Sequence, residues 1–288
     1  MSRSFHLVRR LGEIAKNYPA FGPAAASLSR LRAGVHGGGL TYVASTAIMD
    51  CMLADLGRAA RQPLDAYIAE LRGDVPLSET FETESRRRKL AKYASWDQRI
   101  ERLTGNIGLY YALVRELRPT VVVETGTATG SMTSLLLAAL HRNAHGKLIS
   151  IDLPAVAGKL SMDIDVTESE TGYWIPQGYR DRWDYRKGDA KVLLPRVLVE
   201  ERVDFFIHDS LHSTSHMAFE YAIARALMPE NAVIMSDDIL WNPSFDAFAK
   251  LNGLKAYAPI GNPNIGALVN KFGAEEHALG VGVAEPAG

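Results

Sequence analysis

Apolar positions in the first third of the chain recur at helical spacing. Up to about residue 96 they fall three or four residues apart, as at Ile48 and Met52 and again at Leu64, Ile68 and Leu71. A run of three glycines at 37–39 interrupts this pattern. The spacing therefore predicts a helical N-terminal region.

From residue 104 onward the pattern changes to short β-branched runs that alternate with helical stretches. Strands are predicted at 120–124, 147–152, 185–187, 203–209 and 232–237, and helices at 130–141, 190–200, 213–228 and 243–251. Strands that alternate with helices are typical of a parallel sheet that is covered on both faces.

Two further strands are predicted at 255–259 and 266–270, on either side of Gly261-Asn262-Pro263-Asn264. This connection is too short for a parallel crossover, so the pair must be antiparallel. We therefore expect a helical region at 1–100, an α/β domain at 101–273 and a tail at 274–288.

Composition excludes several classes of protein. The 288 residues include 32 basic and 33 acidic side chains, and this balance gives no general field for a nucleic acid. The most apolar stretch, 40–56, is broken by Asp50 and Asp55, so no membrane span is expected. Cys51 is the single cysteine, which fits a reducing compartment, and we expect a cytoplasmic protein.

The most informative segment is the glycine turn Glu124-Thr125-Gly126-Thr127-Ala128-Thr129-Gly130, between a buried strand and a helix. Such a turn brings a nucleotide-like ligand close to backbone N–H groups at a helix N-terminus. The dinucleotide fingerprint would need glycine where Ala128 and Ser131 stand, which disfavours a nicotinamide-dependent oxidoreductase. A tight turn without a ligand stays open as an alternative.

Acidic residues follow three successive predicted strands. Glu124 would attract a cationic amino group, and Asp152 at the end of the next strand could accept both hydroxyl hydrogens of a ribose. Asp189 could accept from an adenine amine, although it is also a good N-cap for a helix that begins at Ala190. Three such acids together favour a ligand site over capping alone.

These residues resemble the class I S-adenosylmethionine-dependent O-methyltransferases, in the group that includes macrolide sugar and cephalosporin-biosynthesis enzymes. The resemblance covers about 104–271 and also rests on these segments: Ile175-Pro176, Arg180-Asp181-Arg182-Trp183, Gly188-Asp189-Ala190, Leu194-Pro195, Ile207-His208-Asp209-Ser210-Leu211-His212-Ser213, His216-Met217 and Ser236-Asp237-Asp238. It implies a Rossmann-like, seven-stranded methyltransferase sheet with an antiparallel last strand, here preceded by a helical appendage.

The resemblance also implies how the cofactor S-adenosylmethionine is bound. Glu124 would serve the methionine amino group, Asp152 the ribose and Asp189 the adenine. The cofactor set is completed by Gly126, Thr127, Gly130 and Ala190. Ala128 departs from the commonest form of the turn by one methyl group.

Three further acids end the next two strands, Asp209 on one and Asp237 with Asp238 on the other. Adjacent carboxylates repel each other unless a cation or solvent relieves them, and Mg²⁺ prefers oxygen ligands. The arrangement resembles catechol O-methyltransferase, in which equivalent positions bind Mg²⁺. We expect a Mg²⁺ or similar divalent ion here, with helix capping and loop hydrogen bonds as the alternative.

His212 is the expected general base, because it matches the base position in catechol O-methyltransferase. An imidazole with a pKa near 6.5 cannot by itself deprotonate an alcohol, whereas a metal that lowers the pKa of the alcohol makes the transfer feasible. A histidine that only holds a loop is the alternative. His208 and His216 are less favoured, because they fall in a strand and on the following helix.

The expected function is O-methylation of a small-molecule hydroxyl, on a sugar, glycoside or other diol of secondary metabolism, by a homo-oligomer. A non-catalytic partner protein with the same fold is an alternative from another class. The insertion 159–184 carries Tyr173, Trp174, Tyr179 and Trp183. These aromatic side chains could form a substrate lid or simply pack.

Overall fold

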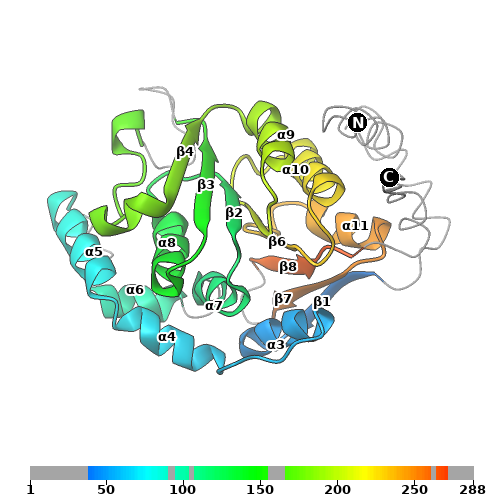
Figure 1. The fold of residues 1–288 in the computed structure, drawn as a ribbon, viewed down its shortest axis with the longest axis horizontal. Helices are drawn as coiled ribbons and strands as arrows, with labels where there is room; N and C mark the ends of the chain where they lie inside the picture. The colour runs from blue at the N-terminus through cyan, green and yellow to red at the C-terminus, as the bar shows by residue number, and fades with distance from the viewer. Residues whose placement is uncertain (1–37, 90–94, 104–106, 155–165, 261–263, 272–288) are drawn as a thin grey trace, which may run out of the picture.

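The computed structural model describes residues 38–89, 95–103, 107–154, 166–260 and 264–271. Within them an eight-stranded sheet in the order β1-β7-β8-β6-β5-β2-β3-β4 lies between two layers of helices (Figure 1). Its strands are β1 (Gly39–Val43), β2 (Val121–Thr125), β3 (Lys147–Asp152), β4 (Trp183–Lys187), β5 (Phe205–His208), β6 (Val233–Ser236), β7 (Lys255–Pro259) and β8 (Gly266–Val269). Only β8 is antiparallel to its neighbours, β6 and β7.

The helices in the described residues are α3 (Ser45–Asp55), α4 (Leu64–Arg72), α5 (Val75–Arg87), α6 (Trp96–Leu103), α7 (Ile107–Leu117), α8 (Ser131–Asn143), α9 (Ala190–Glu200), α10 (Thr214–Leu227) and α11 (Ser244–Leu251). Two short 3₁₀ helices, η2 (Glu168–Glu170) and η3 (Gln177–Arg182), precede β4. Each strand and helix predicted after residue 104 is present within about two residues of its expected ends, and the closing antiparallel pair is confirmed.

Successive residues of the central strands pack into different layers. Val121 and Val123 of β2 belong to the cluster formed with α9, α10 and α11, whereas Val122 belongs to the cluster formed with α3, α7 and α8. All five residues of β2 are buried. This double burial explains why the strands appear in the sequence as continuous apolar runs.

The sheet has one strand more than the seven expected, because β1 pairs in parallel with β7. Gly39, the last glycine of the run that interrupts the helical pattern, is the first residue of this strand. A Cβ on Gly38 would lie 2.7 Å from the backbone of Gly253 and Leu254, so only glycine lets the chain approach β7 this closely. The N-terminal region is therefore not wholly helical.

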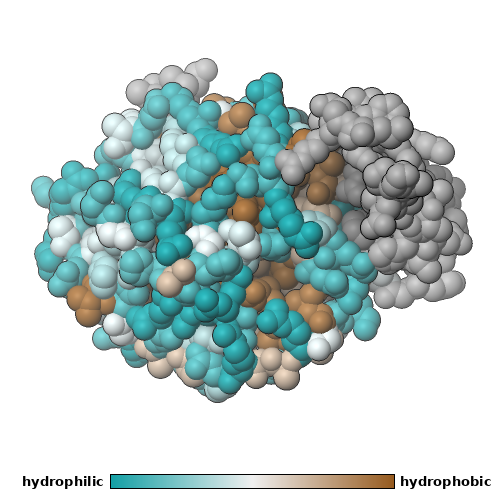
Figure 2. Space-filling model, viewed as in Figure 1, coloured by the Kyte–Doolittle hydropathy of each residue, from teal (hydrophilic) through white to brown (hydrophobic). Residues whose placement is uncertain are grey.

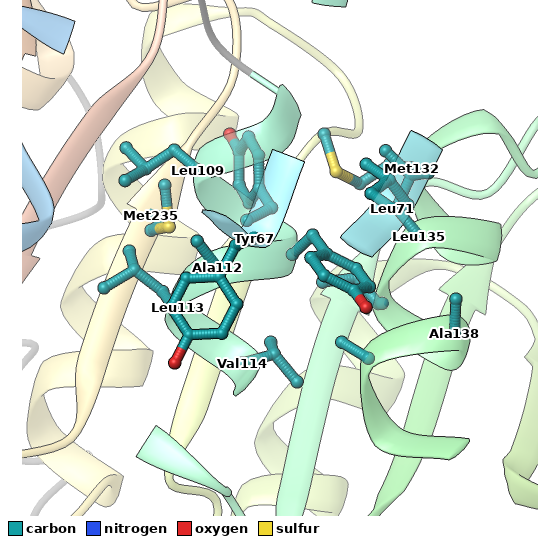
Figure 3. Close-up of a cluster of buried hydrophobic side chains, with 14 of the residues drawn as sticks. Tyr67, Leu71, Leu109, Ala112, Leu113, Val114, Met132, Leu135, Ala138 and Met235 are labelled. Atoms are coloured by element: carbon teal, nitrogen blue, oxygen red, sulfur yellow. The ribbon is translucent and has the colours of Figure 1, made fainter. Parts of the chain in front are cut away.

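Helices α3 to α7 share one hydrophobic cluster with the sheet. In the close-up of this cluster Met235 of β6 lies beside Leu113 of α7, and Leu71 of α4 lies beside Met132 of α8 (Figure 3). The domain division at residue 100 stays a prediction. Residues 1–37 and the predicted tail at 274–288 lie outside the described residues.

The described part of the 159–184 insertion packs against the N-terminal helices. Trp174 and Tyr179 are buried, and the Tyr179 hydroxyl donates to Asp74 at the start of α5 over 2.7 Å. Trp174 also contacts the ring of Phe81 at 5.3 Å between centroids. Trp174 and Tyr179 are thus packed side chains in this structure.

The face of the molecule seen in Figure 2 is mostly hydrophilic, with small hydrophobic patches near its centre. Among the described helices, none combines the length and the hydrophobicity that crossing a membrane requires.

Candidate active site

The acids predicted from the sequence gather at the carboxyl ends of adjacent strands. Asp152 ends β3, Glu124 lies one residue before the end of β2, and Asp209 and Asp237 directly follow β5 and β6. The backbone ladder continues just past the strand ends, since Asp209 N–H donates to Thr125 O over 2.9 Å. Asp237 N–H likewise donates to His208 O over 2.9 Å. Open α/β sheets bind their ligands at this edge.

The glycine turn after β2 lies close to the β5–α10 loop. Gly126 has φ +88°, and a Cβ there would stand 1.9 Å from the carbonyl oxygen of Asp209. Gly130, with φ +80°, precedes α8, and Ala128 has φ +44° although it is not glycine. A non-glycine residue in this region is strained, and such strain is concentrated at functional sites.

Gly126→Ala should lower the free energy of unfolding by more than about 2 kcal/mol, because left-handed strain of about 1–2 kcal/mol adds to the overlap with Asp209. Gly57→Ala is the matched control, since Gly57 has φ +68° but open space around its Cβ position. Urea unfolding measures both. Equal losses in the two variants would contradict the close approach of the two loops.

Glu124 is fully buried beneath this turn. Its Oε1 accepts from the hydroxyls of Thr133 and Ser150, each at 2.6 Å, whereas its Oε2 has no hydrogen-bond partner in the part of the chain that the structure describes. Burial raises the pKa of Glu124 to about 7, and the two hydroxyls oppose this rise. A cationic ligand group at Oε2 would relieve the buried charge.

Because the folded-state pKa of Glu124 is raised above its unfolded value, stability is lost as pH rises from about 5 to about 7. At about 1.36 kcal/mol per unit this amounts to about 3 kcal/mol. Glu124→Gln, which never ionises, should therefore lose less stability than the wild type between pH 5 and pH 8. Urea unfolding at both values measures the difference, and equal losses would rule out the raised pKa.

The other two expected cofactor acids differ from each other. Asp152 accepts from Ala128 N–H over 3.3 Å, and burial raises its pKa despite this backbone donor. Asp189 is exposed and accepts from Lys191 N–H over 2.8 Å, as the N-cap of α9. Asp189 therefore does cap α9, as the alternative interpretation expected. Because its side chain is exposed, it is also accessible to a ligand at the edge of the sheet beside β4.

The three acids at the ends of β5 and β6 repel one another when they are ionised. Burial, followed by the charge of Asp237, raises the pKa of Asp209 well above its usual range. Burial and the charge of Asp238 raise the pKa of Asp237 to about 6. Asp238 has φ +50°, and its Oδ1 accepts from Asn264 over 2.6 Å.

The donor chemistry of these acids, three oxygen ligands with unrelieved repulsion, fits a hard divalent cation. As they stand, no three His, Cys, Asp or Glu side chains in the described residues are arranged to hold a metal ion.

His212 lies between two of these acids. Its Nε2 is 3.7 Å from Asp238 Oδ2 and 3.9 Å from Asp209 Oδ1, and has no hydrogen-bond partner among the described residues. Burial, and then the charge of His208, lower the pKa of His212. A lowered pKa keeps the ring neutral near pH 7, so it is able to accept a proton.

Sequence reasoning missed several groups near His212, near the acids after β5 and β6 or under the loop that follows β5. The Trp241 ring lies 5.3 Å from His212, and the buried Tyr110 hydroxyl of α7 has no partner among the described residues. Glu220 is buried under the same loop and bonds His208 and His216. The available signal was Glu220 itself, an acid four residues after His216 on the apolar side of a helix.

Comparisons with known proteins extend the geometric picture. Residues 123–239 match the family described as a methyltransferase domain. TomG, an O-methyltransferase from Streptomyces achromogenes solved with SAM, is 16% identical over 69% of this chain and 91% of its own, with a TM-score of 0.46. The Podospora anserina methyltransferase PaMTH1, bound to SAH, is 13% identical over 69% of this chain and 88% of its own, with a TM-score of 0.46.

An O-methyltransferase from Bacillus cereus in complex with SAH is 18% identical over 68% of this chain and 91% of its own, with a TM-score of 0.44. No curated protein matches the chain. The matched family spans β2 to the end of β6, the segment that carries Glu124, Asp152, Asp209 and Asp237. Residues 123–239, together with a sheet in which β8 is the one reversed strand among the described strands, are thus similar to a methyltransferase domain.

Proposed function

We propose that the chain transfers the methyl group of S-adenosylmethionine to a hydroxyl oxygen of a small molecule, with His212 as the general base. The observation that carries this proposal is the placement of buried side-chain atoms that have no hydrogen-bond partner within the described ranges. Glu124 Oε2 and Thr127 Oγ1 lie at the glycine turn, and His212 Nε2 lies beside the acids that follow β5 and β6. Buried polar atoms are nearly always satisfied, so these atoms favour a ligand at this edge.

On the cofactor side, Glu124 would accept from the methionine ammonium and Asp152 from the ribose hydroxyls. The turn would place the cofactor at the N-terminus of α8, where the first N–H groups of a helix can bind a ligand. Asp189 would accept from the adenine amine in addition to capping α9. A cationic sulfonium nearby would also favour the ionised form of Asp209, whose pKa is raised by burial and by the charges of Asp237 and Glu124.

On the acceptor side, Asp209, Asp237 and Asp238 would hold a divalent cation such as Mg²⁺. Bound there, the cation would lower the pKa of a substrate hydroxyl. His212, neutral because of its lowered pKa, would take the hydroxyl proton on Nε2. S-adenosylmethionine, when bound, would supply the methyl group to the substrate oxygen, and its sulfur would keep the electron pair of the broken bond as a neutral thioether.

The surroundings of His212 suggest the kind of acceptor. Leu211, which precedes His212 in the sequence, is 63% exposed, and Trp241, whose ring lies 5.3 Å from His212, is 53% exposed. Leu240, which precedes Trp241 in the sequence, is 58% exposed. Exposed apolar groups beside a polar catalytic edge favour a substrate with an apolar or ring-shaped part next to its hydroxyl. A vicinal diol on a sugar or a catechol-like ring fits both the cation and this apolar rim.

The test is methyl transfer from labelled S-adenosylmethionine to a panel of diols, with matched mono-alcohols and amines as controls. We expect label on at least one diol and a much lower rate with its mono-alcohol. Transfer to amines alone would contradict a hydroxyl acceptor.

A further inference from the structure

The carboxylate of Glu220 is the centre of a buried hydrogen-bond network under the candidate active site. Glu220 lies on α10 and is wholly inaccessible to solvent. Its Oε2 is 2.6 Å from both Thr125 Oγ1 and His208 Nδ1. Its Oε1 is 2.9 Å from Ser210 Oγ and 2.8 Å from His216 Nε2.

Three of these partners are direct neighbours in sequence of proposed site residues. Thr125 ends β2 immediately before Gly126, and His208 and Ser210 stand on either side of Asp209. The Glu220 carboxylate thus joins the end of β2 to the loop after β5, which carries both Asp209 and His212. The same loop already meets the turn at Gly126, where no side chain fits.

The direction of the hydrogen bonds follows from the charge of Glu220. The charges and hydrogen bonds of His208 and His216 outweigh the effect of burial and lower the pKa of Glu220 to about 2. An ionised carboxylate only accepts, so His208 must carry a proton on Nδ1 and His216 one on Nε2. Both hydroxyls must also donate to it.

The buried network around Glu220 is not explained by a gain in stability. A fully buried charge pair is often replaced by apolar residues of similar size without loss of stability. Here the surrounding face of α10 is apolar, with Met217, Tyr221 and Ala224 all buried. A carboxylate retained in this position is better explained by the placement of its partners than by stability.

We propose that Glu220 is a positioning residue that holds the loop carrying Asp209 and His212 against the end of β2. This role rests on the proposed function, because it sets where the base stands relative to the methyl donor. Glu220 touches neither cofactor nor substrate, so its loss should lower kcat and leave cofactor binding nearly unchanged. The turn keeps its own bonds, Gly126 N–H to Ile151 O and Gly130 N–H to Thr127 O.

The test compares Glu220→Gln with Glu116→Gln. Glu116 is a matched control, because it is also buried and accepts from Tyr67 and Arg61. An amide must present its NH₂ to donors on one side, so it breaks the pattern around Glu220. We expect Glu220→Gln to lower kcat roughly 10- to 100-fold, with the Kd for S-adenosylhomocysteine within about threefold of wild type. Glu116→Gln should keep the wild-type kcat.

Nitrogen-15 NMR of the histidine rings supplies a readout that does not depend on activity. In the wild type His208 should be protonated on Nδ1 and His216 on Nε2, and in Glu220→Gln at least one ring should change. A wild-type His208 protonated only on Nε2 would overturn the proposal.

Ser210→Ala tests the positioning role of Glu220 if the Glu220→Gln variant does not fold. It removes one donor to the carboxylate, and we expect kcat to fall about three- to tenfold at unchanged Kd. An unchanged kcat in an active enzyme overturns the role of Glu220 alone. A wild type that transfers no methyl group to any acceptor would instead refute the proposed function.

Discussion

Replacing His212 with glutamine should lower kcat by about 100- to 10,000-fold, the range that loss of a general base produces. Glutamine fills a similar space but cannot take a proton from the acceptor hydroxyl. Because His212 Nε2 lies beside Asp209 and Asp238, which are not proposed cofactor ligands, the Kd for S-adenosylhomocysteine should stay within about threefold. The measurement is steady-state transfer to the best diol, with binding followed by calorimetry.

His145→Gln is the control for this variant. His145 is exposed and follows α8, at the end of the molecule opposite the candidate site. Its kcat should equal that of the wild type. If His212→Gln retained more than a tenth of the wild-type kcat, another group would have to be the base.

Removal of divalent cations should lower the transfer rate by at least about 100-fold, because a metal supplies several kcal/mol of charge stabilisation. Asp237→Asn should lower the rate similarly at a low Mg²⁺ concentration and recover in part as Mg²⁺ is raised. The physical reason for binding at these acids is that a divalent cation would relieve the repulsion between Asp237 and its neighbour Asp238. Rates are measured after chelation and again after Mg²⁺ is returned.

Asp204→Asn provides the comparison for the acid substitution. Asp204 precedes β5 at the amino edge of the sheet, where it accepts from Thr120 N–H over 2.8 Å. It should respond to Mg²⁺ as the wild type does. Full activity of the chelated enzyme on every diol would eliminate the metal role of Asp209, Asp237 and Asp238.

The doubly buried strands explain why most of the sheet could be predicted from the sequence. β3 was predicted with the same ends that it has in the structure, because its apolar run is bounded on both sides by polar residues. β1 was missed because its pairing with β7 joins Gly39 to Lys255, more than 200 positions away along the chain. No local period records such a contact, and glycine runs usually mark loops.

The candidate site was predictable to the extent that strand ends place its residues. Asp209 and Asp237 follow adjacent strands, so their convergence followed from the fold. The hydrogen bonds that hold the loop of Asp209 in place could not be predicted in this way. Glu220 is twelve residues from its partner His208 and ninety-five from Thr125, and only the crossing of α10 over the sheet brings these groups together.

Calorimetric titration of the wild-type protein with S-adenosylhomocysteine tests the central claim most directly, with NAD⁺ as the competing ligand and Asp152→Asn as the control variant. We expect one molecule of S-adenosylhomocysteine to bind per chain, no heat of binding from NAD⁺, and an affinity about tenfold or more lower in Asp152→Asn, because one charged hydrogen-bond acceptor is lost. Binding of NAD⁺ in preference to S-adenosylhomocysteine, or equal affinity in the two proteins, would contradict a methyl-donor site at the carboxyl ends of β2 and β3.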